Sequence, residues 1–381
     1  MKIVLLSSGL RPEYGGSAIS EASLAAALAP HSSVTMLCPT GRWASTFTGR
    51  FGLDDVRVFS PFDVVSAFVA RGHWLRGLLD TADIVHVNGH WRWETYLITR
   101  LCRRAGVPYV LQPRGMLLVG HRNVALKRLF NHLIGCEIVR RAATVIALSR
   151  YETTQFEPYR ISSDRIAIVP NGIPHPLVPR TATTGNLNRT PHFLYIGRLE
   201  ARKNVLVLVD AYAEYRRSGG TARLVMVGPA ERGYDDEVRA HVHALALTPH
   251  VSLLPPVYDD GKWSMIRAAI AVIYPTVHEA YGRVPFEAVA ADVFPLVPDE
   301  SGSAEYLAPF LPYCIYDHRS HFALAAAMRA VERRSDRADL ARARAHLTCV
   351  LDWKQIAATV VALYEAAANG VTTGVLGSRS S

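Results

Sequence analysis

Short apolar runs rich in β-branched residues alternate with helical patterns along the chain, and this alternation restarts once. Such a rhythm is typical of βαβ units and a parallel sheet. The runs occupy residues 2–6, 34–38, 84–87, 109–111 and 144–148 in the first half, and 192–196, 223–227, 251–254, 270–274 and 294–297 in the second. The pattern therefore predicts an α/β protein with two parallel-sheet domains.

The segment between the two halves has a different composition. Residues 170–191, PNGIPHPLVPRTATTGNLNRTP, are dense in Pro, Gly, Asn and Thr, as interdomain linkers often are. A chain of 381 residues is also too long for one ordinary core. We expect an N-terminal domain over residues 1–175 and a C-terminal domain over residues 190–350.

The second half contains two glutamates with an informative spacing. In HEAYGRVPFEAVAA, Glu279 and Glu287 lie eight residues apart, after an apolar run that reads as a buried strand. If Pro285 opens a helix, Glu279 lies on the preceding loop and Glu287 in the first turn, beside N–H groups that attract anions. The carboxylates could accept hydrogen bonds from sugar hydroxyls and the amides could bind phosphate, so the pattern suits a nucleotide sugar. An ordinary solvated helix start has the same pattern.

A second local pattern, YIGRLEARKN, follows the strand expected at residues 192–196. Gly197 frees the backbone, and Arg198 and Lys203 place two cations at a strand end, where they can clamp a diphosphate. The later acids show no DxD spacing. We therefore expect a metal-independent site, with no metal ligands and no cofactor.

Three loops of the first half also follow expected strands. Gly15 and Gly16 precede a helix, which suits close approach of an anion, although a simple turn explains them equally well. IVHVNGHWRW carries polar and aromatic groups that suit a sugar ring. QPRGM offers Arg114, which could hold a phosphate or simply lie at the surface.

Charge is distributed unevenly along the chain. Residues 1–180 hold 21 Lys and Arg against 12 Asp and Glu, whereas the remaining residues hold 21 of each, so the first half carries the whole net charge of +9. Residues 64–79 and 125–134 have a basic amphipathic character typical of helices on anionic membranes, and also of core helices. The partner of the first half could be a membrane, an anionic acceptor or nucleic acid, although a solvated basic surface is equally possible.

Cysteine usage and hydropathy indicate a compartment. Five scattered cysteines without a CxxC indicate reduced thiols. The N-terminus becomes polar too early for a signal peptide, and no apolar run reaches membrane-spanning length. We expect a cytoplasmic protein, which could associate with the inner face of the plasma membrane.

Taken together, these motifs resemble the retaining glycosyltransferases of the GT4 family, which have the GT-B fold of two Rossmann-like domains facing across a cleft. The resemblance covers nearly the whole chain. The matching segments, in order, are IVHVNGHW, QPRGM, VPNG before the linker, GRLEARK, and the Glu279–Glu287 pair. The first two are similar to segments of members that build bacterial surface polysaccharides.

The resemblance implies roles for individual residues. The diphosphate would contact Arg198 and Lys203, and the ribose would contact Glu287. The donor sugar would contact Glu279 and the amides around Tyr281 and Gly282, with Gly15 and Gly16 close to the phosphates. Residues 351–370 would form a helix that crosses back onto the first domain. The acceptor side would be formed by Asn88, His90, Trp91 and Arg114.

The chain departs from the family pattern at several positions. Asn88 replaces a histidine, Ala280 a glycine, and Arg283 an apolar residue, while residues 292–295 replace a G-x-P. These changes put the donor sugar and base in doubt.

We expect a retaining hexosyltransferase that uses a nucleotide sugar, with GDP-mannose preferred over a UDP-hexose on family frequency alone. Its acceptor would be a lipid-linked or otherwise anionic glycan in surface-polysaccharide synthesis. The alternatives are a nucleotide-sugar epimerase of the same architecture, and a basic membrane- or nucleic-acid-binding protein with a degenerate donor site. No nucleic-acid-binding motif is recognised in the sequence.

Overall fold

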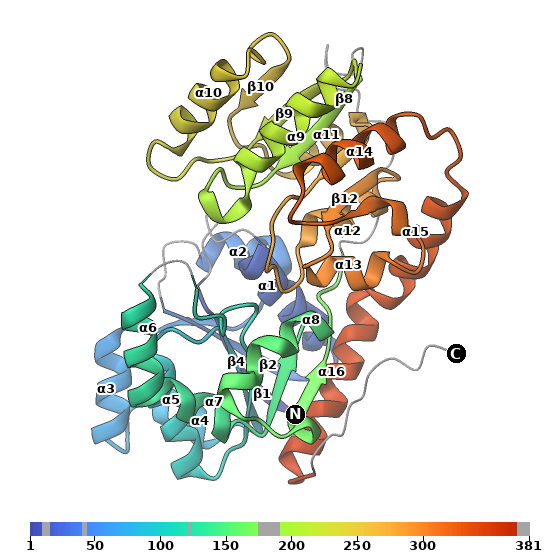
Figure 1. Ribbon diagram of the computed structural model, residues 1–381. Helices are drawn as coiled ribbons and strands as arrows, with labels where there is room; N and C mark the ends of the chain where they lie inside the picture. The colour runs from blue at the N-terminus through green and yellow to red at the C-terminus, as the bar shows by residue number, and fades with distance from the viewer. Residues whose placement is uncertain (10–15, 40–43, 121–122, 174–190, 372–381) are drawn as a thin grey trace. The chain divides into compact units, whose positions relative to one another are not determined.

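The computed structural model describes residues 1–9, 16–39, 44–120, 123–173 and 191–371 (Figure 1). The chain forms two compact units. Unit 1 comprises Met1–Gly172 together with the chain from Leu351 onward, and unit 2 comprises Ile173–Val350. Each unit is an α/β structure around a parallel sheet, so the predicted fold class of two Rossmann-like domains is confirmed. The linker predicted at residues 170–191 lies mostly outside the described residues.

Unit 1 contains a seven-stranded sheet in the order β3-β2-β1-β4-β5-β6-β7, and all its strand pairs are parallel. Its strands are β1 (Lys2–Leu6), β2 (Ser33–Cys38), β3 (Val56–Val58), β4 (Ile84–Asn88), β5 (Tyr109–Gln112), β6 (Thr144–Ala147) and β7 (Ile166–Ile168). Its helices are α1 (Gly16–Leu28), η2 (Ala29–His31), α2 (Ala44–Phe51), α3 (Pro61–Val69), α4 (Trp74–Asp80), α5 (Trp93–Ala105), α6 (Val124–Phe130), the π-helix η3 (Asn131–Gly135), α7 (Cys136–Arg141), α8 (Arg150–Thr153), η4 (Thr154–Tyr159), η5 (Ser163–Arg165) and α16 (Trp353–Ala368).

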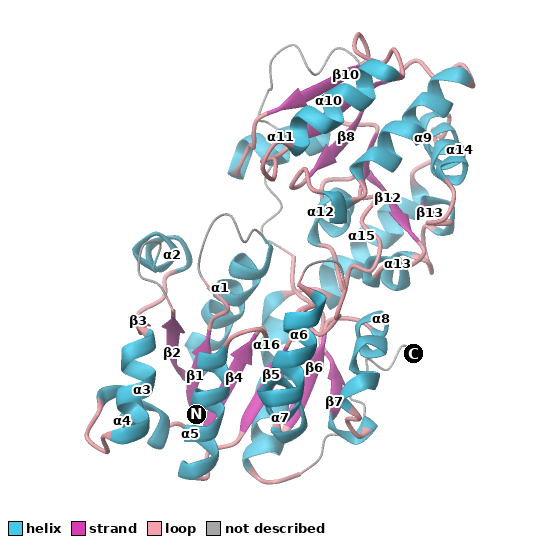
Figure 2. Ribbon diagram, turned by 60° about the vertical axis from the view of Figure 1, so that its left-hand side comes forward, coloured by secondary structure: helices cyan, strands magenta, loops and turns pink. Residues whose placement is uncertain are grey.

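The two faces of this sheet bury alternate residues of each strand. Val4 and Leu6 of β1 belong to the core under α3, α4, α5 and α7, whereas Ile3 and Leu5 belong to the core under α1 and α16. This alternation follows from the two-residue period of a strand. Figure 2 shows the strands of this sheet as neighbouring arrows with helices packed around them.

The C-terminal helix α16 is part of unit 1 and packs against α1. It buries an apolar stripe with helical spacing, which includes Ile356, Val360 and Leu363. Asp352 caps its first turn by accepting hydrogen bonds from the amides of Lys354 and Gln355. The hydroxyl of Tyr364 lies 2.6 Å from His86 Nδ1 on β4, so the end of the chain is joined to the centre of the sheet.

Unit 2 contains a six-stranded parallel sheet in the order β10-β9-β8-β11-β12-β13. Its strands are β8 (His192–Ile196), β9 (Arg223–Val227), β10 (Val251–Leu254), β11 (Ala271–Ile273), β12 (Phe294–Pro298) and β13 (Ile315–Tyr316). Its helices are η7 (Ala201–Lys203), α9 (Val205–Arg217), α10 (Tyr234–Ala244), α11 (Asp259–Ala268), α12 (Arg283–Ala290), α13 (Gly302–Leu307), η8 (Pro312–Cys314), α14 (His321–Glu332) and α15 (Ala338–Val350). Helices α9 and α14 pack against each other, and α11 and α12 contribute to a core cluster with β8 and β9.

Several elements differ from the sequence-based expectation. Strands β3, β7 and β13 were not predicted, because they are short, partly exposed edge strands, unlike the equally short but fully buried central strand β11. The amphipathic stretch 64–79 is two helices, since His73 caps a new helix after Gly72. Helix α12 begins at Arg283, two residues before Pro285, which places Glu287 beyond the first turn.

Among the described residues, no single helix is both long and apolar enough to cross a membrane, whereas α15 and α16 taken together meet that length and composition across a 42° bend.

We predict that Gly228→Ala will destabilise unit 2 by about 2–4 kcal/mol. Gly228 follows β9 with φ of 150°, and a Cβ there would lie 1.8 Å from the carbonyl oxygen of Gly197. Urea unfolding measures the effect. Gly233→Ala is the control, because Gly233 has φ of 77° but open space around it, so it should cost only about 1–2 kcal/mol. Equal effects of the two substitutions would contradict the close approach of Gly228 to Gly197.

Candidate functional site

The sequence-predicted donor residues of unit 2 follow the carboxyl ends of two adjacent strands. Gly197 and Arg198 come directly after β8, and Glu279 lies in the loop between β11 and α12. Strands β8 and β11 are parallel neighbours, so their carboxyl ends share one edge of the sheet. This is the edge at which open α/β sheets bind ligands.

Lys203 and Glu279 meet at this edge and form a largely buried ion pair. The Lys203 ammonium lies 2.8 Å from Glu279 Oε2 and also donates to the hydroxyl of Tyr274, at 3.0 Å. That hydroxyl in turn donates to Glu279 Oε2, also at 3.0 Å. The ammonium and phenol therefore fix the carboxylate from two sides.

The electrostatic setting keeps this carboxylate ionised. Burial alone would raise the pKa of Glu279, but the charge of Lys203, and then that of Arg202, outweighs burial and lowers the pKa to about 2. Burial alone would lower the pKa of Lys203, but the charge of Glu279 outweighs this effect, so the pKa is raised above its ordinary value. Both groups are thus charged at neutral pH.

Two arginines lie beside this pair and share one acid. Glu200 Oε1 is 3.1 Å from Arg198 NH2 and 3.5 Å from Arg202 Nε. The Arg198 side chain is 48% exposed, whereas Glu200 is buried. Together with Lys203 and Glu279, the cluster contains three cations and two carboxylates and is net positive, which suits an anionic ligand. Sequence reasoning missed Glu200, Arg202 and Tyr274, although the alternating charges of residues 198–203 were a usable signal.

Backbone conformation shapes the loops around the cluster. Gly282 has φ of 71°, and a Cβ there would lie 2.8 Å from the ring of Tyr274. His278, directly before Glu279, also has a positive φ, of 56°, which is strained for a non-glycine residue. The backbone amide of Gly302, the first residue of α13, donates to the carbonyl oxygen of Glu279 at 2.8 Å, so the start of α13 also holds this loop.

Glu287 occupies a separate, enclosed environment on α12. Its carboxylate lies 2.5 Å from the Lys262 ammonium and 3.4 Å from Arg283 NH2, and its side chain is 2% exposed. Burial raises its pKa, but the charges of Lys262 and Arg283 more than compensate, so the pKa is lowered. Tyr281 is also buried, with its ring stacked on Phe286 at 4.5 Å between centroids. The sequence predicted neither cation as a partner of Glu287.

In unit 1 the structure places Asn88 and Arg114 in one buried polar network. Arg114 Nε donates to Asn88 Oδ1 at 2.8 Å, and its NH1 donates to Asn171 Oδ1 at 2.7 Å. Arg114 also has a positive φ, of 55°, and its side chain is 2% exposed. The arginine is therefore enclosed by protein in the described structure, and its partner Asn171 belongs to the VPNG segment that precedes the predicted linker.

Glu21 completes this network from α1. Its carboxylate accepts hydrogen bonds from both serine hydroxyls that follow β1, Ser7 and Ser8, each at 2.6 Å, and lies 4.0 Å from Arg114 Nε. Burial raises the pKa of Glu21, and the charge of Arg114 opposes that rise. Sequence reasoning missed Glu21 as well, because nothing in an alanine-rich helix marks its one buried acid.

The remaining predicted residues of unit 1 lie near the carboxyl ends of β1 and β4. His90 is buried and packs edge-on against Trp91, with 4.6 Å between ring centroids. Gly16 is the first residue of α1 and is exposed, whereas Gly15 lies outside the described residues.

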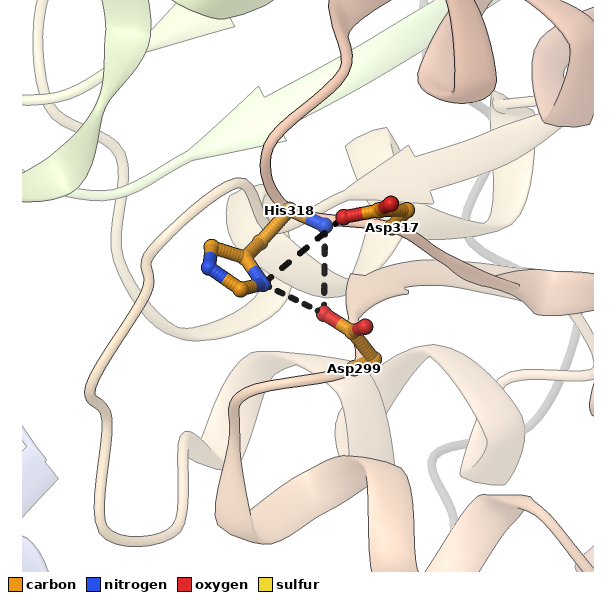
Figure 3. Close-up of side chains that lie close together, drawn as sticks. All are labelled: Asp299, Asp317 and His318. Carbon is orange, nitrogen blue, oxygen red and sulfur yellow. Dashed lines mark hydrogen bonds and ion pairs between the residues drawn. The ribbon is translucent and has the colours of Figure 1, made fainter.

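One group of potential metal ligands occurs in the described part of the chain: Asp299, Asp317 and His318, with one ligand atom of each within 4.8 Å of the others (Figure 3). Their atoms already have partners. His318 Nδ1 lies 2.7 Å from Asp299 Oδ1, and both oxygens of Asp317 accept from Arg319. The group is best described as a clamp that ties the loop after β12 to the loop after β13.

Both halves of the sequence match known families. Residues 183–346 match the family described as "Glycosyl transferases group 1", and residues 15–172 match that described as "Glycosyl transferase 4-like domain". The chain belongs to the GT-B glycosyltransferases. The likeness to members that build bacterial surface polysaccharides stays a prediction.

Curated relatives of this glycosyltransferase match part of its length. D-inositol 3-phosphate glycosyltransferase of Nocardia farcinica is 30% identical over 178 residues, which is 44% of this chain and 40% of that protein. Glycogen synthase of Mycobacterium tuberculosis is 27% identical over 251 residues, which is 63% of this chain and 58% of that protein. The chain thus spans about half the length of these relatives.

The fold of the glycosyltransferase resembles that of HepE from Anabaena, solved in complex with UDP-glucose. The TM-score is 0.78 at 18% sequence identity, and the match covers 96% of this chain and all of the other. At this identity the likeness supports the GT-B fold.

We predict that Lys203→Met will destabilise the protein by about 3 kcal/mol, because it removes the ion-pair partner of a largely buried carboxylate. Lys203→Met combined with Glu279→Gln should recover part of that loss. Urea unfolding of both variants measures this coupling, and simple additivity would contradict it. The exposed pair Arg217–Glu214 is the control and should contribute less than about 1 kcal/mol.

The same pair predicts a pH dependence of stability. The pKa of Glu279 is about 2 in the folded protein against an ordinary value of 4.5. Its stabilising contribution is therefore complete above about pH 4.5 and is lost as the pH falls toward 2. Denaturation of wild type and Glu279→Gln across this range should converge at the acid end, and a constant difference would contradict the assignment.

Proposed function

We propose that the protein transfers a hexose from a nucleotide sugar to a glycan acceptor. The observation that carries this proposal is the net-positive cluster of Arg198, Arg202 and Lys203 around Glu200 and Glu279, at the carboxyl ends of β8 and β11. This cluster lies within the part of the chain that matches glycosyl transferases group 1. Unit 2 would bind the donor, and unit 1 the acceptor.

In this proposal Arg198 and Lys203 hold the donor diphosphate. As the glycosidic bond breaks, negative charge grows on the departing diphosphate, and fixed cations in a partly enclosed site stabilise that charge without a metal ion. Lys203 is preorganised for this task, because Glu279 and Tyr274 already fix its ammonium. The anomeric configuration would be retained, with the departing phosphate accepting the proton of the attacking hydroxyl.

The two glutamates have different tasks in the proposal. Glu279, with the amides of Tyr281 and Gly282, would hold the hydroxyls of the donor sugar. Glu287 would hold the ribose hydroxyls, and Lys262 and Arg283 keep its carboxylate ionised and therefore able to accept hydrogen bonds. A hydroxyl-bearing ligand would share this carboxylate with the two cations.

We predict that Arg198→Ala and Lys203→Ala will each weaken donor binding at least tenfold, since each removes a charge-assisted hydrogen bond of about 1.5–3 kcal/mol. Binding is measured by thermal shift with UDP, GDP, UDP-glucose and GDP-mannose, with Mg²⁺ or EDTA. Ligand at a hundred times its Kd stabilises by about 2.7 kcal/mol. Arg217→Ala, an exposed arginine of the same unit, is the control and should bind donor as wild type does.

The screen also decides the donor base. GDP-mannose was the expectation from family frequency, whereas the HepE complex contains UDP-glucose, so both series are compared directly. Equal stabilisation in EDTA supports metal independence. If no nucleotide or nucleotide sugar stabilises the protein and no labelled sugar is transferred, the proposal is overturned. Those results would favour a binding protein with a degenerate donor site.

We further propose that unit 1 rests on an anionic membrane at the cytoplasmic face and receives a lipid-linked acceptor for surface-polysaccharide synthesis. The support is a stripe of exposed leucines at helical spacing on α6 and η3: Leu126, Leu129 and Leu133 are 63%, 52% and 65% exposed. Lys127 and Arg128 flank the stripe, and the first half of the chain carries the excess positive charge. Apolar insertion and attraction to anionic lipid then act together.

Membrane association predicts that replacing the three leucines with serine will reduce binding to vesicles containing phosphatidylglycerol at least tenfold. Sedimentation with vesicles measures binding, and raised salt should weaken the wild type by screening the basic residues. Phe322→Ser, which alters an exposed apolar residue of unit 2, is the control and should bind normally. If the leucine variant binds vesicles as the wild type does, the three leucines do not form the membrane-binding surface.

A further inference from the structure

A π-helix interrupts the helical segment between α6 and α7 in unit 1. It spans Asn131–Gly135 and widens the helix by one residue, a feature that often accompanies functional sites. A Cβ at Gly135 would lie 2.3 Å from Asn131 Oδ1 and 2.9 Å from His90 Nε2. Only glycine therefore leaves room for the contact between Asn131 and His90.

This contact is the start of a chain of hydrogen bonds. His90 Nε2 lies 2.9 Å from Asn131 Oδ1, and Asn131 Nδ2 donates to the hydroxyl of Tyr159 at 2.8 Å. That hydroxyl donates to the carbonyl oxygen of Leu117 at 3.3 Å. The carbonyl of Leu117 can only accept, so the Tyr159 hydroxyl donates its proton there and accepts from Asn131 Nδ2. Asn131 Oδ1 then faces His90 and can only accept, so the proton of His90 must lie on Nε2.

The other ring nitrogen of His90 is left without a partner. Nδ1 is buried, and no described residue forms a hydrogen bond with it. In the Nε2–H tautomer this nitrogen has a lone pair and is a hydrogen-bond acceptor. An unpaired buried acceptor is costly, so this atom is suited to a donor supplied by a ligand.

Aromatic rings hold the imidazole in place. Phe130, Tyr159 and Trp91 contact it edge-on, at 5.5, 5.7 and 4.6 Å between ring centroids. Burial lowers the pKa of His90 to about 4, while the hydrogen bond to Asn131 opposes that fall. The ring is therefore neutral at pH 7. Charged and titratable groups on the surrounding elements are Arg92 and Glu94, which pair with each other, and Lys127, Arg128, His132, Glu157 and Tyr159.

We propose that Asn131 and Tyr159 are positioning residues that lock His90 in the Nε2–H tautomer, so that its Nδ1 accepts a hydrogen bond from a hydroxyl of the sugar substrate. That the hydroxyl belongs to a sugar rests on the proposed transferase function. The tautomer lock, by which Asn131 and Tyr159 hold His90 in the Nε2–H form, depends on unit 1 alone. Asn131 and Tyr159 act through His90 and need not touch substrate.

The lock is tested first without any substrate. Long-range ¹H–¹⁵N spectra of histidine side chains distinguish the two neutral tautomers, and His90→Gln identifies the signals of His90. We expect the Nε2–H form in the wild type. In Tyr159→Phe the Asn131 amide loses its acceptor and can reverse, so a mixture of tautomers is expected. A wild-type Nδ1–H tautomer, or a tautomer unaffected by Tyr159→Phe, would overturn the proposal.

Asn131→Asp provides the second arm, because it keeps the shape of the side chain but adds a negative charge beside Nε2. A carboxylate favours the protonated ring, so the pKa of His90 should rise, and Nδ1 should lose its lone pair at a higher pH than in the wild type. Both the NMR titration of His90 and the acid limb of the pH profile of kcat/KM should move upward by at least one pH unit. A spectrum of Asn131→Asp with an unshifted His90 titration would overturn the lock.

His132→Gln is the matched control, since His132 is exposed on the same π-helix and outside the hydrogen-bond chain. It should change neither the tautomer of His90 nor the pH profile. If no donor and acceptor support transfer, the proposed function fails, while the spectra still decide the lock. If transfer occurs and the His90 titration moves in Asn131→Asp but the pH profile does not, the contact between Nδ1 and the substrate is wrong.

Discussion

The parallel pairing of β8 with β11 brings together the residues of the proposed donor site. It brings the loops after both strands to one edge of the sheet, where Lys203 and Glu279 become largely buried. Two buried charges are tolerated only when they are paired and hydrogen-bonded, and Tyr274 supplies the additional hydrogen bonds. The result is a cation whose position is fixed before any ligand arrives.

The charged groups of unit 2 fall into two sets with different character. Around Glu200 and Glu279, cations outnumber carboxylates and Arg198 is half exposed, so an anion can approach. Around Glu287, two cations enclose a single buried carboxylate. A ligand there would have to share an existing ion pair, and Arg283 is one of the residues in which this chain departs from the family pattern. If Glu287 binds the ribose as proposed, the strength of its ion pairs with Lys262 and Arg283 would affect donor binding.

Unit 1 also contains buried charged groups, but most of their hydrogen-bond partners are neutral. Arg114 and Glu21 are both buried, with 4.0 Å between Arg114 Nε and Glu21 Oε1. The side-chain amides of Asn88 and Asn171 accept hydrogen bonds from Arg114, and the hydroxyls of Ser7 and Ser8 donate to Glu21. His90 lies in a similar network, but one nitrogen has no partner among the described residues. The contrast between a satisfied arginine and an unsatisfied histidine makes His90 the stronger candidate for ligand contact in this unit.

Periodicity alone predicted most of the long elements. The runs at residues 2–6, 192–196 and 223–227 coincide with β1, β8 and β9, because a buried parallel strand is a continuous apolar run bounded by polar residues. Sequence spacing also identified Arg198, Lys203, Glu279 and Glu287 as candidates, since cations and acids after strands are visible in one dimension. The short strands β3, β7 and β13 were missed, because they lie at sheet edges and are only partly buried, so no long apolar run marks them.

The amino-acid sequence was sufficient to predict the two parallel-sheet units and the residue types at their strand ends. The partners could be found only in the folded protein, since Lys203 and Glu279, Lys262 and Glu287, and Asn131 and His90 are separated by 76, 25 and 41 positions. The fold also decided that Arg114 is enclosed and that Leu126, Leu129 and Leu133 are exposed. Pairing and burial depend on which loops a sheet brings together, and the order of strands in a sheet cannot be read from local spacing.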